Sequence, residues 1–419
     1  MKTYRELFAI REFRTLFLAS CAGIAGQTSS ALALGALTYA ATGSALLTAL
    51  SMFGAPLANV VGSLTLLSAA DGVPPRRALS LGATLSAIGL ALQAVPGLPL
   101  WARFAVILSI GYVGSVTSGA RWALISEMLP AGAYVLGRST MNASVGIMQI
   151  AGFGLGGIML AWLSPYQVFA AATVLAAGSA ALVRFGLTER PARSAHRVTV
   201  GRTLRVNRAL LADRGRRALY LNLWVPNGLI VGCEALFVPY AGNRAGFLFA
   251  AGALGMLAGD VGVGRFTSPA RRERWIRPLR LLLALPYLAF ALHPALPLAV
   301  LIPLVASAGY GAALPLQERL IRRCPDEVRG QLLGLANNGM MAGQAVCAAL
   351  AGLLADRLPV ASAIAVLAAL SLTAALVLTR GLRHTDPAPQ LPVPTPAPES
   401  SAAPGQGPAP TAAPATPGR

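Results

Sequence analysis

The most restrictive feature of the sequence is a series of apolar runs, each about as long as a bilayer is thick. A helix rises ~1.5 Å per residue, so it needs roughly 20 apolar residues to cross ~30 Å of hydrocarbon. Twelve such windows lie between residues 14 and 379. Only 12% of the residues are charged, which is about half the share in a soluble domain. The sequence therefore predicts an all-α membrane protein with twelve transmembrane helices.

Two polar segments interrupt this series. The first, residues 187–218, is rich in arginine and separates six spans from six. The second, residues 384–419, is rich in proline and too polar to bury a core. We therefore predict an N-terminal six-helix bundle over residues 1–186, a basic cytoplasmic linker, a C-terminal six-helix bundle over residues 219–383, and a disordered cytoplasmic tail.

The cations are distributed unevenly between the two sides of the membrane. The chain has 34 Lys and Arg against 15 Asp and Glu, a net charge of +19. If the N-terminus is cytoplasmic, Arg103, Arg244 and Arg357 are the only cations that lie on the outer side of the membrane. By the positive-inside rule, both termini are then cytoplasmic, in the inner membrane of a bacterium, with the basic side against anionic lipid. A nucleic-acid partner is not expected, because so apolar a chain cannot build the polar basic surface that such a partner needs.

Residues that usually carry metal or enzyme chemistry are scarce and scattered. The four cysteines have no C-x-x-C spacing, and the three histidines lie far apart in the sequence. Lys2 is the only lysine, which excludes P-loop and Schiff-base sites, since these need a lysine inside a folded core. We therefore expect no cofactor, no metal and no enzymatic activity.

The two halves match each other at an offset of 195 residues, which aligns the fifth span with the eleventh without a gap. Equal orientation of the two copies implies a parallel repeat, with two bundles related by an axis along the membrane normal. The matching pairs are Pro130 with Pro325, Asn142 with Asn337, Gln149 with Gln344, and Gly157 with Gly352.

Two six-span halves joined by a long loop resemble the major facilitator superfamily of secondary transporters, and a short motif strengthens the likeness. The family's loop after the second span reads roughly G-x-L-A-D-R-x-G-R-R. Here Asp71, Arg76 and Arg77 keep charged positions of the motif, whereas both glycines and the first arginine are absent. The resemblance covers about residues 10–382 and implies ion pairs that hold one conformer.

The second half keeps less of this motif. Arg271 and Arg272 take the equivalent places, but the acidic position is Phe266. Asp260 and Arg265 lie nearby, and we expect them to form a substitute gating ion pair about one turn apart at the end of a helix.

A glycine cluster in the fifth span also resembles the family. Its antiporters often carry G-P-x-x-G-G there, and Gly152, Gly156 and Gly157 keep the glycines without the proline. Small residues in apolar spans let helices approach closely, so we expect close packing between the two halves. The stretch from Arg121 to Asn142 is similar to the loop after the fourth span of bacterial drug and siderophore exporters. These likenesses imply export by alternating access.

Glu234 is the first candidate for a working residue. A charged side chain inside a span costs ~2.5–3.5 kcal/mol, so its presence needs a reason. Glu234 lies about 22 Å into a helix that starts near Leu219. We predict that it couples proton flow to the conformational change. The alternative is a partly wetted residue near the outer mouth, paired with Arg244 or Arg103.

Uncharged polar residues near mid-span are the expected lining of the pathway. Gln27 lies near the midplane of the first span, and the repeat puts Gln149 and Gln344 at matching depths on opposite sides of the axis. The alternative for these glutamines is hydrogen bonding between helices, worth ~0.6 kcal/mol. Further candidates for substrate contact are Asn222, Asn227 and Tyr310.

We place no Lys or Arg at mid-span, which favours a lipophilic or weakly polar substrate over a sugar phosphate or dicarboxylate. The sequence thus predicts a monomeric secondary transporter, a proton-coupled exporter (antiporter) of a small amphipathic compound such as a drug or secondary metabolite. A proton-coupled importer of a small solute is the alternative. A further alternative is a non-transporting receptor or a membrane enzyme with the same fold.

Overall fold

The computed structural model describes residues 4–66, 73–191, 200–267, 269–324 and 329–382. Asp71 and the tail 384–419 lie outside these ranges, and so does the side chain of Arg271. Regular structure in the described ranges is entirely helical.

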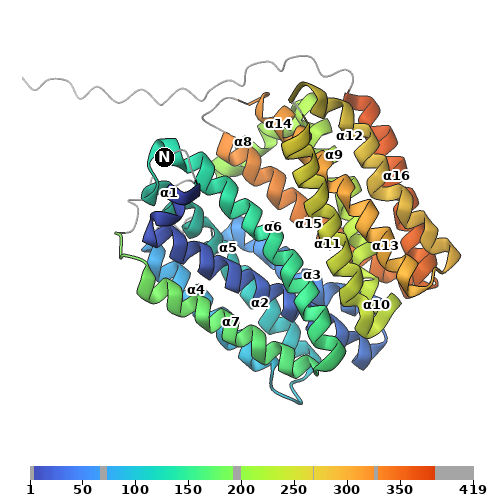
Figure 1. The fold of residues 1–419 in the computed structure, drawn as a ribbon, viewed down its shortest axis with the longest axis horizontal. Coiled ribbons are helices and arrows are strands. Elements are labelled where there is room, and N and C mark those ends of the chain that lie inside the picture. The colour runs from blue at the N-terminus through green and yellow to red at the C-terminus, as the bar shows by residue number, and fades with distance from the viewer. Residues whose placement is uncertain (1–3, 67–72, 192–199, 268, 325–328, 383–419) are drawn as a thin grey trace, which may run out of the picture. The chain divides into compact units, whose positions relative to one another are not determined.

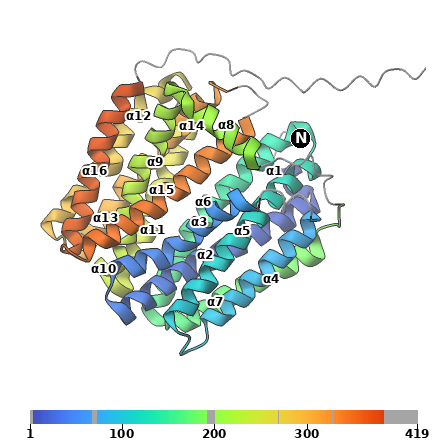
Figure 2. The same cartoon turned by 180° about the vertical axis from the view of Figure 1, so that it is seen from behind.

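The helices form two groups, which we call the first and second bundles (Figures 1 and 2). The first bundle contains α1 (Tyr4–Ala9), α2 (Arg11–Thr42), α3 (Ala45–Thr65), α4 (Pro75–Gln93), α5 (Leu100–Met128), α6 (Ala131–Trp162) and α7 (Pro165–Gly186). The second contains α9 (Arg214–Ala235), α10 (Phe237–Ala241), η1 (Gly242–Arg244), α11 (Ala245–Phe266), α12 (Pro269–Ala284), η2 (Leu285–Leu292), α13 (Leu296–Ala306), η3 (Ser307–Ala312), α14 (Ala313–Ile321), α15 (Arg329–Ala355) and α16 (Val360–Gly381). The linker contributes α8 (Val200–Ala212), a helix that the sequence analysis did not foresee.

The described helices account for the twelve spans that the sequence predicts. Nine helical stretches are long and apolar enough to cross a membrane, and one of them, Arg214–Phe266, contains both α9 and α11. The apolar part of α6 is shorter, Ile147–Trp162. The remaining span is α4, whose first turn carries Arg76 and Arg77.

Prolines divide the ninth and tenth spans into α-helical and 3-10 segments. Pro286 is the second residue of η2, and it cannot continue the α-helical hydrogen bonds of α12 because it has no amide hydrogen. Pro303 lies near the end of α13, after which the chain tightens into η3. Both spans still reach membrane length.

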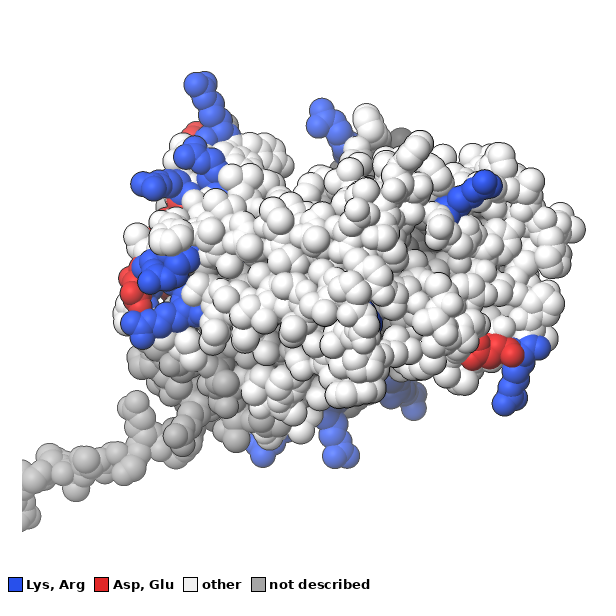
Figure 3. All heavy atoms as spheres, turned by 90° about the horizontal axis from the view of Figure 1, so that it is seen from below, with Lys and Arg blue, Asp and Glu red and all other residues white. Residues whose placement is uncertain are grey.

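We call the two ends of the bundles the basic end and the far end. The basic end is where α2 begins and where α7 and α16 end, and it carries Arg14, Arg184 and Arg380. The far end carries the short turns that join α2 to α3 and α6 to α7. Figure 3 shows one face on which most charged side chains lie near the edges and uncharged residues cover most of the middle, as expected of a surface that contacts lipid.

Glycines allow neighbouring helices to touch through their backbones. A Cβ added at Gly111 in α5 would lie 2.7 Å from the Cα of Ala55 in α3, and one at Gly259 in α11 would lie 2.7 Å from the carbonyl carbon of Ala308. Because non-bonded carbons normally stay ~3.5–4.0 Å apart, no larger residue fits at these positions without moving a helix.

Candidate functional site

Glu234 lies where the seventh span breaks. α9 ends at Ala235 and α10 begins at Phe237. Cys233 and Ala235 are fully buried, whereas Glu234 is partly exposed. Tyr310 in η3 donates a hydrogen bond from its hydroxyl group to Glu234 Oε1 over 3.1 Å. A carboxylate therefore links the seventh and tenth spans inside the second bundle.

The arginines considered as partners of Glu234 do not contact it. Arg103 is 1% exposed, and its guanidinium donates to the carbonyl oxygens of Gln93 (2.6 Å), Val95 (3.0 Å) and Leu98 (3.1 Å). It therefore closes the turn between α4 and α5. Arg244 in η1 forms no ion pair with a described residue. Among the described residues, Glu234 therefore forms no ion pair with Arg103 or Arg244, as its alternative role would require.

Arg280 is a buried cation in the same bundle that the sequence analysis missed. It is 2% exposed, and its Nε and Nη2 have no hydrogen-bond partner among the described residues. It lies close enough to Tyr310 to interact with it electrostatically. Counted from Arg272, where the apolar span begins, Arg280 lies ~12 Å deep.

Arg280 therefore lies near the middle of the span Arg272–Leu292, although we placed no Lys or Arg at mid-span. The charged run before Arg280 resembled a loop, but α12 starts at Pro269 and continues through Pro278, so it carries Arg280 into the bundle. A buried guanidinium without a carboxylate partner is costly, which makes Arg280 a candidate for function rather than for stability.

Three of the predicted pathway residues bind other helices. Gln344 in α15 donates to Asn227 Oδ1 in α9 over 2.9 Å. Asn222 in α9 is fully buried and donates to the carbonyl oxygen of Leu378 in α16 over 3.0 Å. Asn222 is thus buried against α16 in this structure, and its contact with substrate stays a prediction.

Gln27 and Gln149 differ from these residues. Both side chains are exposed, and neither makes a hydrogen bond to another described residue. They lie on α2 and α6, two helices that pack against each other and that Ser29 links by donating to the carbonyl oxygen of Gly152 over 2.8 Å. The structure thus leaves polar side chains of the first bundle available to a ligand.

At the far end, α6 of the first bundle meets α11 of the second. A Cβ added at Gly157 would overlap the Cα of Gly246 and would lie 2.8 Å from its carbonyl carbon. One turn closer to the basic end, Phe153 and Phe249 stack with ring centroids 4.8 Å apart. The backbones of the two bundles therefore touch along this seam.

A second seam joins α3 to α15. Asp356, which follows α15, accepts hydrogen bonds from the amide of Ala45 (2.9 Å) and the hydroxyl group of Ser44 (3.2 Å) at the start of α3. A carboxylate at a helix N-terminus satisfies free amide groups and interacts favourably with the helix dipole. Farther toward the basic end, Asn338 donates to Ser63 over 3.1 Å. The far end is thus held closed on both seams.

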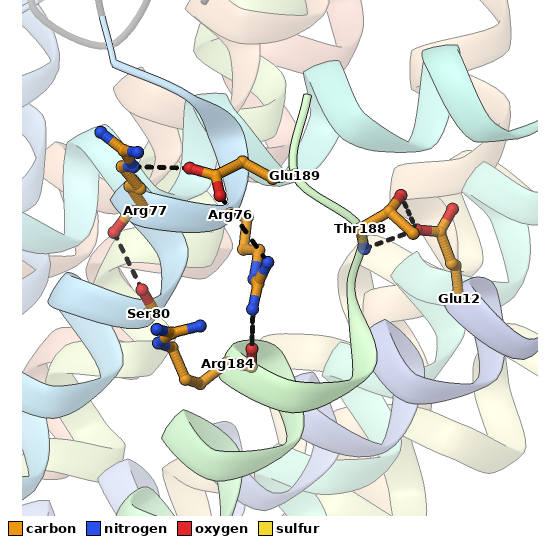
Figure 4. A network of polar contacts seen from close by, with 7 residues as sticks. All are labelled: Glu12, Arg76, Arg77, Ser80, Arg184, Thr188 and Glu189. Carbon is orange, nitrogen blue, oxygen red and sulfur yellow. Dashed lines mark hydrogen bonds and ion pairs between the residues drawn. The ribbon is translucent and has the colours of Figure 1, made fainter. Parts of the chain in front are cut away.

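The basic end of the first bundle holds two charge clusters around the segment that leaves α7 (Figure 4). Glu189 pairs with Arg77 over 2.6 Å and with Arg76 over 3.9 Å. Arg76 also donates from Nε to the carbonyl oxygen of Arg184 over 3.1 Å, and Arg184 lies in the last turn of α7. Glu12 of α2 accepts from the amide of Thr188 over 2.8 Å.

Comparisons with known proteins agree with this architecture. The family model described as "Major Facilitator Superfamily" matches residues 240–415. A crystal structure of a POT family transporter in complex with a thioalcohol-conjugated peptide superposes with a TM-score of 0.69 at 12% identity, over 88% of this chain and 96% of that chain. Residues 240–415 therefore match this superfamily, and the fold of the described chain is similar to that of a transporter.

Other structures of the superfamily fold are equally similar. The nucleoside transporter NupG matches with a TM-score of 0.69 at 15% identity, over 89% of this chain and all (100%) of that chain. A bacterial homolog of the human lysosomal transporter Spinster, in an inward-facing and occupied conformation, matches with a TM-score of 0.66 at 13% identity, over 91% of this chain and 96% of that chain. No curated protein sequence matches the chain.

The arginines of the two motif loops bind different elements in the two halves. Arg272 donates to the carbonyl oxygens of Gly264 (2.8 Å) and Thr267 (3.0 Å) at the end of α11, the helix before it, and it pairs with Glu318 of α14. Arg76 instead binds the end of α7, the last helix of the first bundle. The glutamates that complete these clusters, Glu189 and Glu318, lie in loops or helix ends far along the sequence, which is why the motif itself did not reveal them.

The predicted gating pair between Asp260 and Arg265 is not formed. Among the described residues Asp260 has no ion-pair partner. The two residues are five positions apart, so their side chains point ~140° apart around α11, whereas pairs form at separations of three or four. Their role in gating stays a prediction, as does that of Asp71.

The glycines of the fifth span divide between two tasks. An added Cβ at Gly152 would meet Thr28, and one at Gly156 would lie 2.9 Å from the Cα of Ser29, both in α2 of the same bundle. Gly157 alone of the three contacts the other bundle. The expected packing between the halves is thus present at Gly157 and absent at Gly152 and Gly156.

Proposed function

We propose that this secondary transporter is a proton-coupled exporter of a small amphipathic compound, and that its two bundles alternate access to a central pathway. The family match and the fold support the transporter class. The glycines of α6, which resemble those of the superfamily's antiporters, favour export. The peptide and the nucleosides named for the similar structures are ligands of those proteins. They indicate only that the fold carries small solutes.

The observation that carries the proposal is the hydrogen bond from Tyr310 to Glu234. A tyrosine hydroxyl donates to a carboxylate and can accept from a carboxylic acid, so the contact can persist in both protonation states of Glu234. The charge between α9 and η3 nevertheless changes by one unit when the proton moves. Protonation of Glu234 can therefore bias how α9 and η3 pack. Arg280 on α12 lies near Tyr310, the residue that donates to Glu234.

The closed far end fits one state of the proposed transport cycle. Gly157 with Gly246 and Asp356 with α3 hold the two seams together. Rocking of one bundle against the other would break these contacts and expose the far side of the pathway. We assign the polar, unpaired Gln27 and Gln149 to substrate contact, and we infer that an amphipathic compound suits a pathway with so few fixed charges.

We further propose that the basic end faces the cytoplasm of a bacterium, so that both termini are cytoplasmic. Arg103, Arg244 and Arg357 lie at far-end turns or helix ends, whereas the arginines of α2, α7 and α16, and those of α12 before Arg280, lie at the basic end. The positive-inside rule supports this orientation.

The decisive experiment measures proton movement during transport. A growth-inhibition screen of overexpressing cells supplies a candidate compound, and purified protein in liposomes with a pH gradient supplies the assay. We expect the compound to dissipate the gradient by moving against the protons. Glu234→Gln should abolish proton movement while leaving exchange of the compound intact, because glutamine keeps the size of the side chain and loses the titration. Full proton coupling in Glu234→Gln would remove Glu234 from the mechanism.

Glu273→Gln is the matched control. Glu273 is a glutamate of α12 that pairs with Arg319 and Arg322 rather than with Tyr310, so its loss should leave coupling unchanged. Movement of the compound in the same direction as the protons would establish the importer alternative instead.

A further inference from the structure

A cavity of about 680 Å³ lies at the basic end of the second bundle. α12 begins there, while α14 and α16 end there, so the cavity lies at the depth where three apolar spans begin or end. Ile276 and Leu376 contribute an apolar wall. The polar wall contains four arginines from the three helices: Arg274, Arg277, Arg319 and Arg380.

The described residues do not balance the charges of this cavity. Glu273 is the one acidic residue among the described residues of its lining, and it already pairs with Arg322 over 2.6 Å and with Arg319 over 3.7 Å. Arg274, Arg277 and Arg380 have no ion-pair partner among the described residues. Like charges gathered around one cavity repel one another, so an anion bound between them would be favoured.

The geometry indicates the chemistry of that anion. Guanidinium groups bind phosphate oxygens through paired hydrogen bonds. The volume of about 680 Å³ falls within the ~300–1,000 Å³ of sites for drug-sized ligands and exceeds what a free phosphate ion fills. The apolar wall beside the arginines adds a surface for hydrocarbon at the edge of the membrane.

We propose that this cavity binds the phosphate headgroup of an anionic phospholipid, with the start of its acyl chains against Ile276 and Leu376. The lipid would bridge α12 and α16, which are far apart in the sequence, and would offset the repulsion between their arginines. Bound lipid therefore stabilises the basic end of the second bundle.

The test uses the full-length protein purified in detergent and measures its thermal unfolding midpoint and its bound lipid by native mass spectrometry. Phosphatidylglycerol, phosphatidylcholine and inorganic phosphate are added in separate titrations. We expect phosphatidylglycerol to raise the midpoint and to remain bound, and phosphatidylcholine to do neither. In Arg277→Gln/Arg380→Gln the apparent affinity for phosphatidylglycerol should fall by at least about tenfold, since each cation near an anionic lipid contributes ~1 kcal/mol.

The control variant is Arg11→Gln/Arg14→Gln, which removes two exposed arginines from the basic end of the first bundle. Equal loss of affinity in the two double variants would overturn the proposal, because it would show non-specific attraction to the basic end. A response to inorganic phosphate as strong as that to phosphatidylglycerol would overturn the assignment to lipid. If Arg277→Gln/Arg380→Gln does not fold, Arg274→Gln tests the same wall. An unchanged affinity in Arg274→Gln then counts against the site.

Discussion

Replacing Gly157 with alanine should open the far end of the protein. Gly157 is the point at which the backbone of α6 touches that of α11. The new Cβ would lie 2.8 Å from the carbonyl carbon of Gly246, where non-bonded carbons normally lie ~3.5–4.0 Å apart. Because the new Cβ would also overlap the Cα of Gly246, the two helices must separate by more than ~1 Å, or the contact must be lost. Overpacking of this kind costs ~1–3 kcal/mol, and the cost applies only to the closed state.

Because the open state does not contain this contact, the substitution shifts the equilibrium toward it. A difference of ~1–3 kcal/mol corresponds to a factor of ~5–150 in the ratio of open to closed protein. The reporter is Ala250→Cys, because the Cβ of Ala250 lies 3.4 Å from the Cβ position of Gly154 across the same seam. The four native cysteines are replaced first, and the rate of maleimide labelling is then measured in detergent.

The matched control is Gly178→Ala. It makes the same chemical change in a helix of the first bundle, but an added Cβ there meets no atom within 4 Å. The effect of alanine on helix propensity is thus the same in both variants. Labelling should accelerate in Gly157→Ala and not in Gly178→Ala. Equal labelling rates in the two variants would refute the argument that the Gly157–Gly246 contact keeps the far end closed.

Three other substitutions test particular contacts. Asp356→Asn removes the charge at the start of α3 and should cost ~0.3–1 kcal/mol of the closed state. The same maleimide reporter should then label faster, and an unchanged rate would mean that the carboxylate does not hold this seam. Gln344→Ala breaks the hydrogen bond to Asn227 and should lower the unfolding midpoint slightly, since such bonds contribute ~0.6 kcal/mol; an unchanged midpoint with lost substrate binding would favour a pathway role instead. Arg280→Met removes a buried charge that lacks a carboxylate partner, so we expect an unfolding midpoint equal to or above that of the original protein together with loss of coupled transport. A strongly lowered midpoint would indicate a structural role for Arg280.

The spans, their number and their class were predictable because they depend on local composition. Burial in hydrocarbon requires a continuous apolar run and a helix, and neither requirement involves contacts between distant residues. Glu234 and Tyr310 could be selected as polar residues in apolar runs, but that they bind each other could not. That contact depends on the break after Ala235 and on the 3-10 segment that contains Tyr310, which set the rotation of both side chains.

The unforeseen contacts have the same origin. Asn222 was a candidate for substrate contact because it is polar within an apolar span, yet polarity does not specify which face of a helix points inward. Arg280 was missed because a charged run before a proline resembled a loop, whereas α12 continues through it. Asp356 and Glu189 gave no local signal, since each acts on a helix terminus far away in the sequence.

By itself, the sequence predicted twelve spans and two related halves. Hydropathy can be read within one helix length, and the repeat can be read by comparing the two halves at an offset of 195 residues. The tertiary structure decided which polar residues meet. It joined Tyr310 to Glu234, placed Gly157 against Gly246, and gathered unbalanced arginines around a cavity at the basic end. The physical reason is that these contacts depend on the rotation and approach of helices, and packing between distant segments sets both.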